Sequence, residues 1–132
     1  MVELVKDYMI KKKEIVAPED SVISAIELMI ENDIGSVIVV DEKTGAVQGI
    51  FTERDILRRF MTSRSKFIHL KISEVMTKPV HTVQPDTKLA EAVKMMRAHD
   101  VARLPVVDKD GKLVGILFWK DIFDNFCCDK IQ

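Results

Sequence analysis

The chain has 132 residues, of which 47% are hydrophobic and 31% are charged, and its formal net charge is −1. This composition is ordinary for a soluble globular protein of one compact domain, or of two small halves that share a core. The near-neutral charge argues against nucleic acid or an anionic membrane as a partner. No apolar run approaches the roughly 18 residues of a membrane helix, and the N-terminus lacks a secretory signal, so we expect a cytoplasmic protein.

The sequence contains a tandem repeat. The in-order matches include Met9–Met76, Val16–Val83, Pro18–Pro85, Ala25–Ala92, Asp33–Asp100, Gly49–Gly115 and Asp55–Asp121. The second copy has one residue fewer in its central turn, DKDGK against DEKTGA. We therefore predict a first motif over residues 1–61, a linker over residues 62–71, and a second motif over residues 72–132 that ends in a short C-terminal tail.

Each copy begins with the same two predicted elements. A short extended stretch comes first, over residues 14–17 and 80–83. A proline followed by polar residues, PEDS or PDTK, then marks the start of a helix. Apolar residues in both helices recur at i, i+3, i+4 and i+7, which predicts one buried stripe per copy; they are Val22, Ala25, Ile26 and Met29, and Leu89, Ala92, Val93 and Met96.

Each copy continues with two strands and a last helix. The β-branched run SVIVVD, or RLPVVD, predicts a buried strand, and a turn leads to a second strand, AVQGIF or KLVGIL. The segments TERDILRRF and FWKDIFDNF predict the closing helices. The order is β-α-β-β-α, an α/β (α+β) arrangement. Neither half can bury its sheet face alone, so we predict two motifs packed by pseudo-twofold symmetry.

The stretch GIFTERD at residues 49–55 carries a candidate binding site. Gly49, late in a strand, permits close approach of a ligand or another backbone. Thr52 lies where the strand hands over to the helix, and the free N–H groups there suit a phosphate. Asp55 lies on the same face one turn later, where its carboxylate can accept both hydroxyls of a ribose, and Arg54 adds a cation. Together these residues predict a nucleotide clamp.

A structural interpretation of the same residues stays open. Thr52 and Asp55 have a spacing close to that of a capping box, and acidic residues are favoured in a first helical turn. Taken alone, the pair is better explained as a cap. The repeat decides little, because the aspartate recurs as Asp121 and a cap would recur as well.

The two copies resemble a pair of CBS domains, the regulatory modules named after cystathionine beta-synthase. The resemblance covers nearly the whole chain and is carried by VAPEDSVISAIELMIENDIGSVIVVDEKTGAVQGIFTERDIL and TVQPDTKLAEAVKMMRAHDVARLPVVDKDGKLVGILFWKDIF. The joint pattern is a strand, a proline, an amphipathic helix, VVD, a turn, Gly-Ile and, in the first copy, Thr-x-x-Asp.

The resemblance implies two clefts, each able to hold an adenosine compound such as AMP, ADP, ATP or S-adenosylmethionine as a regulatory ligand. The resemblance implies neither a required cofactor nor catalysis. It does imply a homodimer that acts on an unknown effector protein. Thr52 and Asp55 would contact phosphate and ribose, the base would lie against two early strand segments, and Arg103 would contact phosphate. The implied nucleotide-binding residues are Ile15, Val16, Ala17, Gly35, Ser36, Val37, Ile38, Thr52, Arg54, Asp55, Arg103, Pro105, Lys120 and Asp121.

The second copy departs from this pattern, because Phe118 replaces the threonine while Asp121 is kept. We therefore expect unequal clefts, the second being empty, holding an uncharged adenosine group, or using Lys120 for charge. Packing of Phe118 and Trp119 in a dimer contact is the competing explanation.

Two functions follow from these residues. The first is a stand-alone regulatory module that binds an adenosine nucleotide and relays energy or metabolite state to a partner protein. The alternative is a ligand-independent interaction or assembly module with vestigial clefts. The sequence shows no catalytic set of residues, and none of its histidines has the spacing of a metal site, so we expect neither an enzyme nor a metalloprotein.

Overall fold

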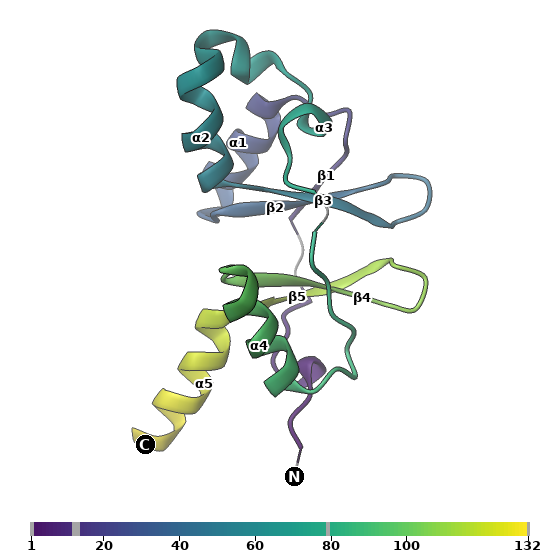
Figure 1. Cartoon of the computed structure of the whole chain (residues 1–132), viewed down its shortest axis with the longest axis vertical. Coiled ribbons are helices and arrows are strands. Elements are labelled where there is room, and N and C mark those ends of the chain that lie inside the picture. Colours follow the sequence, from purple (N-terminus) through teal and green to yellow (C-terminus); the bar gives the residue numbers. More distant parts are fainter. Residues whose placement is uncertain (1, 12–13, 79, 132) are drawn as a thin grey trace. The chain divides into compact units, whose positions relative to one another are not determined.

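The structure is a computed structural model that describes residues 2–11, 14–78 and 80–131, the side chains of residues 63, 64 and 126–131 excepted. The predicted C-terminal tail lies outside the described side chains. The chain divides into two compact units (Figure 1). We call residues 13–80 the first-repeat unit, and residues 1–12 together with 81–132 the second-repeat unit.

The first-repeat unit contains a three-stranded sheet in the order β1-β2-β3. Its elements are β1 (Ile15–Val16), α1 (Val22–Asn32), β2 (Ser36–Val40), β3 (Val47–Thr52) and α2 (Glu53–Ser63). Strand β1 is parallel to β2, and β2 is antiparallel to β3. Helices α1 and α2 lie on one face of this sheet (Figure 1).

Helix α1 forms where the sequence pattern predicts it. The Ser21 side chain accepts a hydrogen bond from the backbone N–H three residues on, at 3.2 Å, and so caps the helix start. Asp33 adopts a left-handed conformation, with φ of 52°, and ends the helix. Val22, Ala25 and Met29 are buried in the core of the unit, which confirms the predicted stripe.

The second-repeat unit repeats these elements. It contains α4 (Leu89–His99), β4 (Arg103–Val107), β5 (Leu113–Phe118) and α5 (Trp119–Ile131). Strands β4 and β5 pair antiparallel, and α4 and α5 lie on one side of this hairpin (Figure 1). The apolar stripe of α4 is buried, as its counterpart in α1 is.

The first strand of the second copy is reduced to a single parallel bridge between Val83 and Val106. Both hairpin turns contain a glycine with positive φ, Gly45 at 77° and Gly111 at 81°, a conformation that glycine adopts without steric cost. The mixed α/β fold class predicted from the sequence is confirmed.

The segment between the repeats packs on the first copy. This inter-repeat arm, which we define as residues 64–78, contains a 3-10 helix (Arg64–His69) and α3 (Ile72–Val75). It then meets β3, where Ile50 and Thr77 exchange two backbone hydrogen bonds of 2.8 and 3.1 Å. The arm thus adds a short antiparallel bridge to the sheet.

Phe67, which lies within the predicted linker, is fully buried in the core of the first-repeat unit. Its ring lies 6.3 Å from that of Phe51 on β3 and 6.5 Å, edge-on, from that of Phe60 on α2. Aromatic pairs at these separations attract beyond their buried area. The predicted linker therefore contributes a side chain to the hydrophobic core of the first-repeat unit, besides connecting the two repeats.

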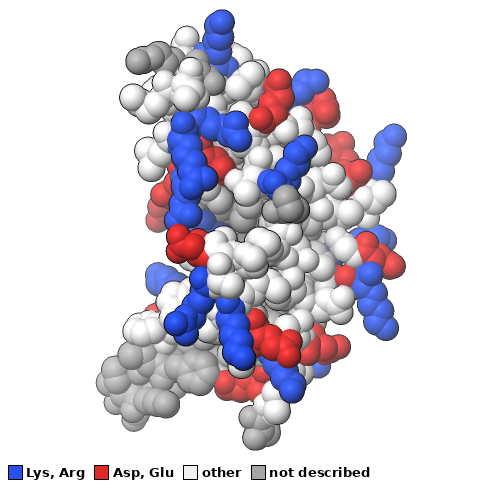
Figure 2. Space-filling model, in the orientation of Figure 1, with Lys and Arg blue, Asp and Glu red and all other residues white. Residues whose placement is uncertain are grey.

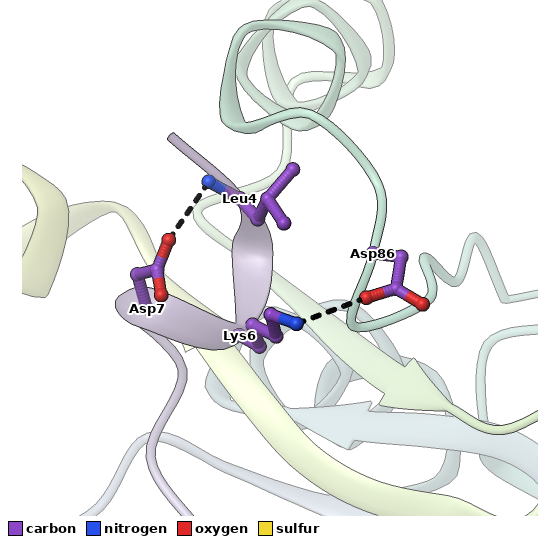
Figure 3. A network of polar contacts seen from close by, with 4 residues as sticks. All are labelled: Leu4, Lys6, Asp7 and Asp86. Atoms are coloured by element: carbon purple, nitrogen blue, oxygen red, sulfur yellow. Dashed lines mark hydrogen bonds and ion pairs between the residues drawn. The ribbon is translucent and has the colours of Figure 1, made fainter. Parts of the chain in front are cut away.

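The N-terminal arm, which we define as residues 2–11, packs in the same way on the second copy. Ile10 and Ile116 exchange backbone hydrogen bonds of 2.9 and 3.0 Å. Nearer the start, the backbone N–H of Leu4 donates to Asp7 Oδ2 at 3.1 Å, and Lys6 forms an ion pair with Asp86 at 3.3 Å (Figure 3). The segment before each repeat therefore belongs to the compact unit of the other repeat.

A lysine of each arm contacts the same acidic position of the repeat. Lys71 pairs with Glu19 at 2.8 Å, as Lys6 pairs with Asp86. The hydrogen bond and charge of Glu19 raise the pKa of Lys71 above its ordinary value. Because both members of each pair are more than half exposed, these contacts orient the arms rather than hold them.

Candidate functional site

The candidate site of the first-repeat unit lies at the junction of β3 and α2. Thr52 is the last residue of the strand, and Asp55 follows in the first helical turn. The Asp55 side chain is only 4% exposed. Its Oδ2 accepts from the backbone N–H of Thr52 at 3.0 Å and from the Thr52 hydroxyl at 3.2 Å. Its Oδ1 accepts from the hydroxyl of Thr77 at 2.7 Å.

The capping interpretation is realised in this geometry. The backbone N–H of Asp55 donates to the Thr52 hydroxyl oxygen at 3.3 Å, while the Asp55 carboxylate accepts from the Thr52 N–H. These reciprocal bonds form a capping box. A cap alone, however, does not require a buried carboxylate, since capping residues work well at the surface and burial of a charge is costly.

Ser36 lies beside this junction, as the cross-strand partner of Thr52 on β2. The carbonyl of Gly35 accepts a hydrogen bond from the first N–H of α2, that of Glu53, at 3.0 Å. Within the described part of the chain, Ser36 and Asp55 are the buried polar or charged side chains. Both flank Thr52, so the buried polar groups gather at one strand–helix junction.

The predicted base-binding residues fall on two faces of the sheet. Val16 and Val37 are buried in the helical core of the unit. Ile15 and Ile38 are cross-strand partners, and by strand alternation they lie on the face away from α1 and α2. The Ala17 N–H donates to an aspartate in the following turn at 2.9 Å. Ile15 and Ile38 thus lie on the sheet face opposite the helices, where Ile15 is exposed and Ile38 is buried.

Three further predicted residues, one from the first-repeat unit and two from the second, lie at the surface or within a sheet. Arg54 is exposed on the first turn of α2, and Lys120 is exposed on the first turn of α5. Pro105 is buried in β4 and its carbonyl accepts from the N–H of Val83 at 3.1 Å. Pro105 therefore takes part in the sheet through its backbone carbonyl.

The second-repeat unit places a different pair at the register position of Ser36 and Thr52. Arg103 and Phe118 are cross-strand partners there, and the guanidinium carbon lies 5.5 Å from the centre of the Phe118 ring. This is a cation–π contact. A pair of hydroxyl-bearing residues in one copy is thus replaced by a cation and an aromatic ring in the other.

The carboxylate of the second copy has different surroundings. Asp121 is half-buried, whereas Asp55 is buried. Ile10 takes the place of Thr77, because Ile10 bridges Ile116 as Thr77 bridges Ile50. Neither hydroxyl that contacts Asp55 has a counterpart in this copy.

Thr77 was not among the predicted site residues. It is 22 positions from Asp55 in the sequence, so no helical or strand spacing joins the two. The repeat offered one signal, because the match of Met9 with Met76 places Ile10 opposite Thr77. That signal marks a difference between the copies without showing what the side chain contacts.

Metal ligation and membrane insertion receive no support from the described residues. No group of three or more histidine, cysteine, aspartate or glutamate side chains among them could hold a metal ion. The rings of His81 and His99 stack face to face, with centroids 3.5 Å apart. Within residues 2–11, 14–78 and 80–131, no helix combines the length and apolar character needed to cross a bilayer.

Comparison with known proteins agrees with this architecture. The CBS domain family model matches residues 5–62 and 72–127. CBS domain-containing protein YhcV of Bacillus subtilis is 33% identical over 121 residues, which cover 92% of this chain and 84% of YhcV. An uncharacterised protein of Methanopyrus kandleri is 37% identical over 106 residues, 80% of this chain but only 54% of that relative.

A solved structure has the same fold over nearly its full length. It is the CBS domain pair of protein MJ0100 in complex with 5′-methylthioadenosine and S-adenosyl-L-methionine. The TM-score is 0.86 at 29% identity, and the match covers 98% of this chain and 99% of that one. With both copies of the repeat matched by one family model, the chain belongs to the CBS domain family and carries two tandem CBS domains.

Proposed function

We propose that this chain is a regulatory module that binds an adenosine compound at the Asp55 site of the first-repeat unit. The observation that carries the proposal is the buried Asp55 carboxylate, flanked by the hydroxyls of Thr52 and Thr77. A carboxylate at the N-terminus of a helix can accept hydrogen bonds from the hydroxyls of a ribose, and the same N-terminus attracts a phosphate. Arg54 stands in the same turn as a further cation.

The adenosyl class is supported by the solved CBS domain pair of MJ0100, which holds methylthioadenosine and S-adenosylmethionine. AMP, ADP, ATP and S-adenosylmethionine share the adenosine group that Asp55 would recognise through its ribose. No feature of the site separates a monophosphate from a triphosphate. The second-repeat unit would bind such a ligand more weakly, because Phe118 and Ile10 remove both hydroxyls.

We further propose a homodimer that signals to a separate effector protein in the cytoplasm. Exposed apolar side chains on the closing helix of each repeat support self-association: Leu57, Phe60 and Met61 on α2, and Trp119 and Phe123 on α5. Acidic and basic side chains are interspersed over the visible face (Figure 2). This pattern gives little support to nucleic acid as the partner.

A second candidate function is a ligand-independent assembly module. The complete capping box of Thr52 and Asp55 favours it, because the pair then has a structural role that needs no ligand. The exposed apolar residues of α2 and α5 would serve the assembly in this case as well.

A thermal-shift experiment separates the two functions. The wild type, Asp55→Asn and its matched control Asp121→Asn would be melted with AMP, ADP, ATP or S-adenosylmethionine. A ligand that binds only the native state raises Tm by mass action. We expect a shift for the wild type and Asp121→Asn, and none for Asp55→Asn. Equal shifts in all three proteins would remove Asp55 from the site, and no shift in any would favour the assembly module.

The ligand-dependent shift, rather than the absolute Tm, is the quantity to compare. Asp55 accepts hydrogen bonds from Thr52 and Thr77, so its replacement lowers Tm even without ligand. Each variant therefore needs its own melt without ligand as the baseline.

A further inference from the structure

We propose that Thr77 is a positioning residue for the Asp55 carboxylate, and that its hold makes the site selective for a vicinal diol. The inference rests on the proposed function and extends it to a residue of the inter-repeat arm. Thr77 donates its hydroxyl to Asp55 Oδ1 at 2.7 Å, a shorter hydrogen bond than either of those that the carboxylate accepts from Thr52.

The number of hydrogen bonds that the Asp55 carboxylate can accept limits how a ligand diol can bind to it. An ionised carboxylate has about four lone-pair positions. Three are taken, two on Oδ2 by the N–H and hydroxyl of Thr52 and one on Oδ1 by Thr77. One hydroxyl of a ligand can therefore bond to Oδ1 directly. A vicinal diol that bonds through both hydroxyls requires one present donor to leave.

The Thr52 hydroxyl is the donor best placed to leave. Its hydrogen bond to Asp55 is the longest of the three, at 3.2 Å, and a hydroxyl can rotate while the backbone N–H of β3 cannot. Once it has turned away, this hydroxyl is available to a phosphate near the start of α2. Diol binding at Asp55 would thus release the group that phosphate binding uses.

Thr77 is well placed to stay. Its backbone forms the two-hydrogen-bond bridge with Ile50, so the side chain is delivered from a fixed main chain. The missing side chain of Gly49 permits this approach, because a Cβ there would lie 2.9 Å from the Thr77 carbonyl oxygen. The carboxylate is thereby held with Oδ2 toward Thr52.

The second copy provides an internal comparison. Gly115 permits the same close approach of Ile10, whose carbonyl oxygen would lie 2.9 Å from an added Cβ. The backbone bridge is therefore conserved between the two units while the hydroxyl is absent. The bridge alone serves packing, and the hydroxyl of Thr77, like that of Thr52, is a feature that the first site has and the second lacks.

The ligand test compares adenosine with 2′-deoxyadenosine by calorimetry, since all the proposed ligands share this nucleoside. We expect the wild type to prefer adenosine about tenfold, or ~1.4 kcal/mol. Thr77→Val frees one lone-pair position on Oδ1 but also releases the orientation of the carboxylate. If the orientation dominates, as we propose, the preference should fall to within about threefold, and Thr77→Ser should restore it. The matched control Ile10→Val should leave it unchanged. Equal weakening of both nucleosides by Thr77→Val would show a merely structural role and overturn the proposal.

A double-mutant cycle tests the positioning without any ligand. Thr77→Val should lower Tm by about 3–5 °C, and this loss should nearly vanish in the Asp55→Ala background, because the hydroxyl then has no carboxylate to hold. An equal loss in both backgrounds would overturn the positioning role.

The two experiments distinguish failure of the inference from failure of the proposed function. If the wild type binds neither nucleoside nor any of the four adenosine ligands (AMP, ADP, ATP and S-adenosylmethionine), the proposed function and the diol selectivity both fall. The cycle still decides whether Thr77 holds Asp55. If the wild type binds adenosine and Thr77→Val keeps the full preference, the inference alone falls.

Discussion

Replacement of Gly49 by alanine should push the inter-repeat arm away from β3. The added Cβ would lie 2.7 Å from Met76 Sδ and 2.9 Å from the Thr77 carbonyl oxygen, where ordinary contact begins at 3.4 Å. The methionine side chain can move aside. The carbonyl cannot do so cheaply, because it accepts the Ile50 N–H at 3.1 Å. Relief of the clash therefore stretches the backbone bridge.

The expected cost follows from two opposing terms. Overpacking of this kind costs about 1–3 kcal/mol. Reduced freedom of the unfolded chain returns about 0.4–1 kcal/mol when glycine becomes alanine. We expect Gly49→Ala to lower the free energy of unfolding by about 1–2 kcal/mol, measured by urea denaturation. Gly115→Ala should cost a similar amount, since its Cβ would meet the Ile10 carbonyl oxygen at 2.9 Å.

Hydrogen exchange provides the decisive readout for this prediction. The amide of Thr77 should lose protection in Gly49→Ala, because its bond to the Ile50 carbonyl weakens, while the amide of Ile38 in the adjacent β1–β2 pairing should keep its protection. A variant as stable as the wild type to within about 0.5 kcal/mol, with an unchanged Thr77 amide, would refute the argument.

Three further predictions concern the arms and the second site. Phe67→Ala should lower the free energy of unfolding by about 3–5 kcal/mol in urea denaturation, and a loss under about 1 kcal/mol would show that the linker adds little core. The double variant Ile10→Thr/Phe118→Thr supplies both missing hydroxyls, so calorimetry should find a second adenosine site; unchanged stoichiometry would contradict this. Glu19 raises the pKa of Lys71 above 10.5, so the stability that this pair adds is present below pH 10.5 and is lost as pH rises through the folded pKa. The Tm difference between the wild type and Lys71→Met should therefore disappear above the folded pKa of Lys71. A Tm difference that persists there would exclude the ion pair as its source.

Local sequence signals predicted much of the fold. The i, i+3, i+4, i+7 stripe of α1, with Ser21 before it, specifies the helix because the periodicity and the cap agree. The spacing of Thr52 and Asp55 likewise predicted a junction at which the two side chains meet. In each case the interacting residues lie within about one helical turn of one another.

Long-range placement could not be predicted in the same way. Nothing in the spacing of Phe67 or Thr77 indicates that the segment before the second repeat packs on the first. The run from Ser36 to Val40 is buried throughout, so no polar alternation marks which side chains face the helices. Val37 consequently stood among the predicted ligand contacts, although its side chain is in the core.

The stoichiometry of binding of adenosine compounds tests the central claim most directly. Purified wild-type protein would be titrated by calorimetry with AMP, ADP, ATP and S-adenosylmethionine in turn. We expect one strong site per chain for at least one of them, because Asp55 is flanked by two threonine hydroxyls and Asp121 has the counterpart of neither. Two equal sites per chain, or no binding by any of the four, would contradict it.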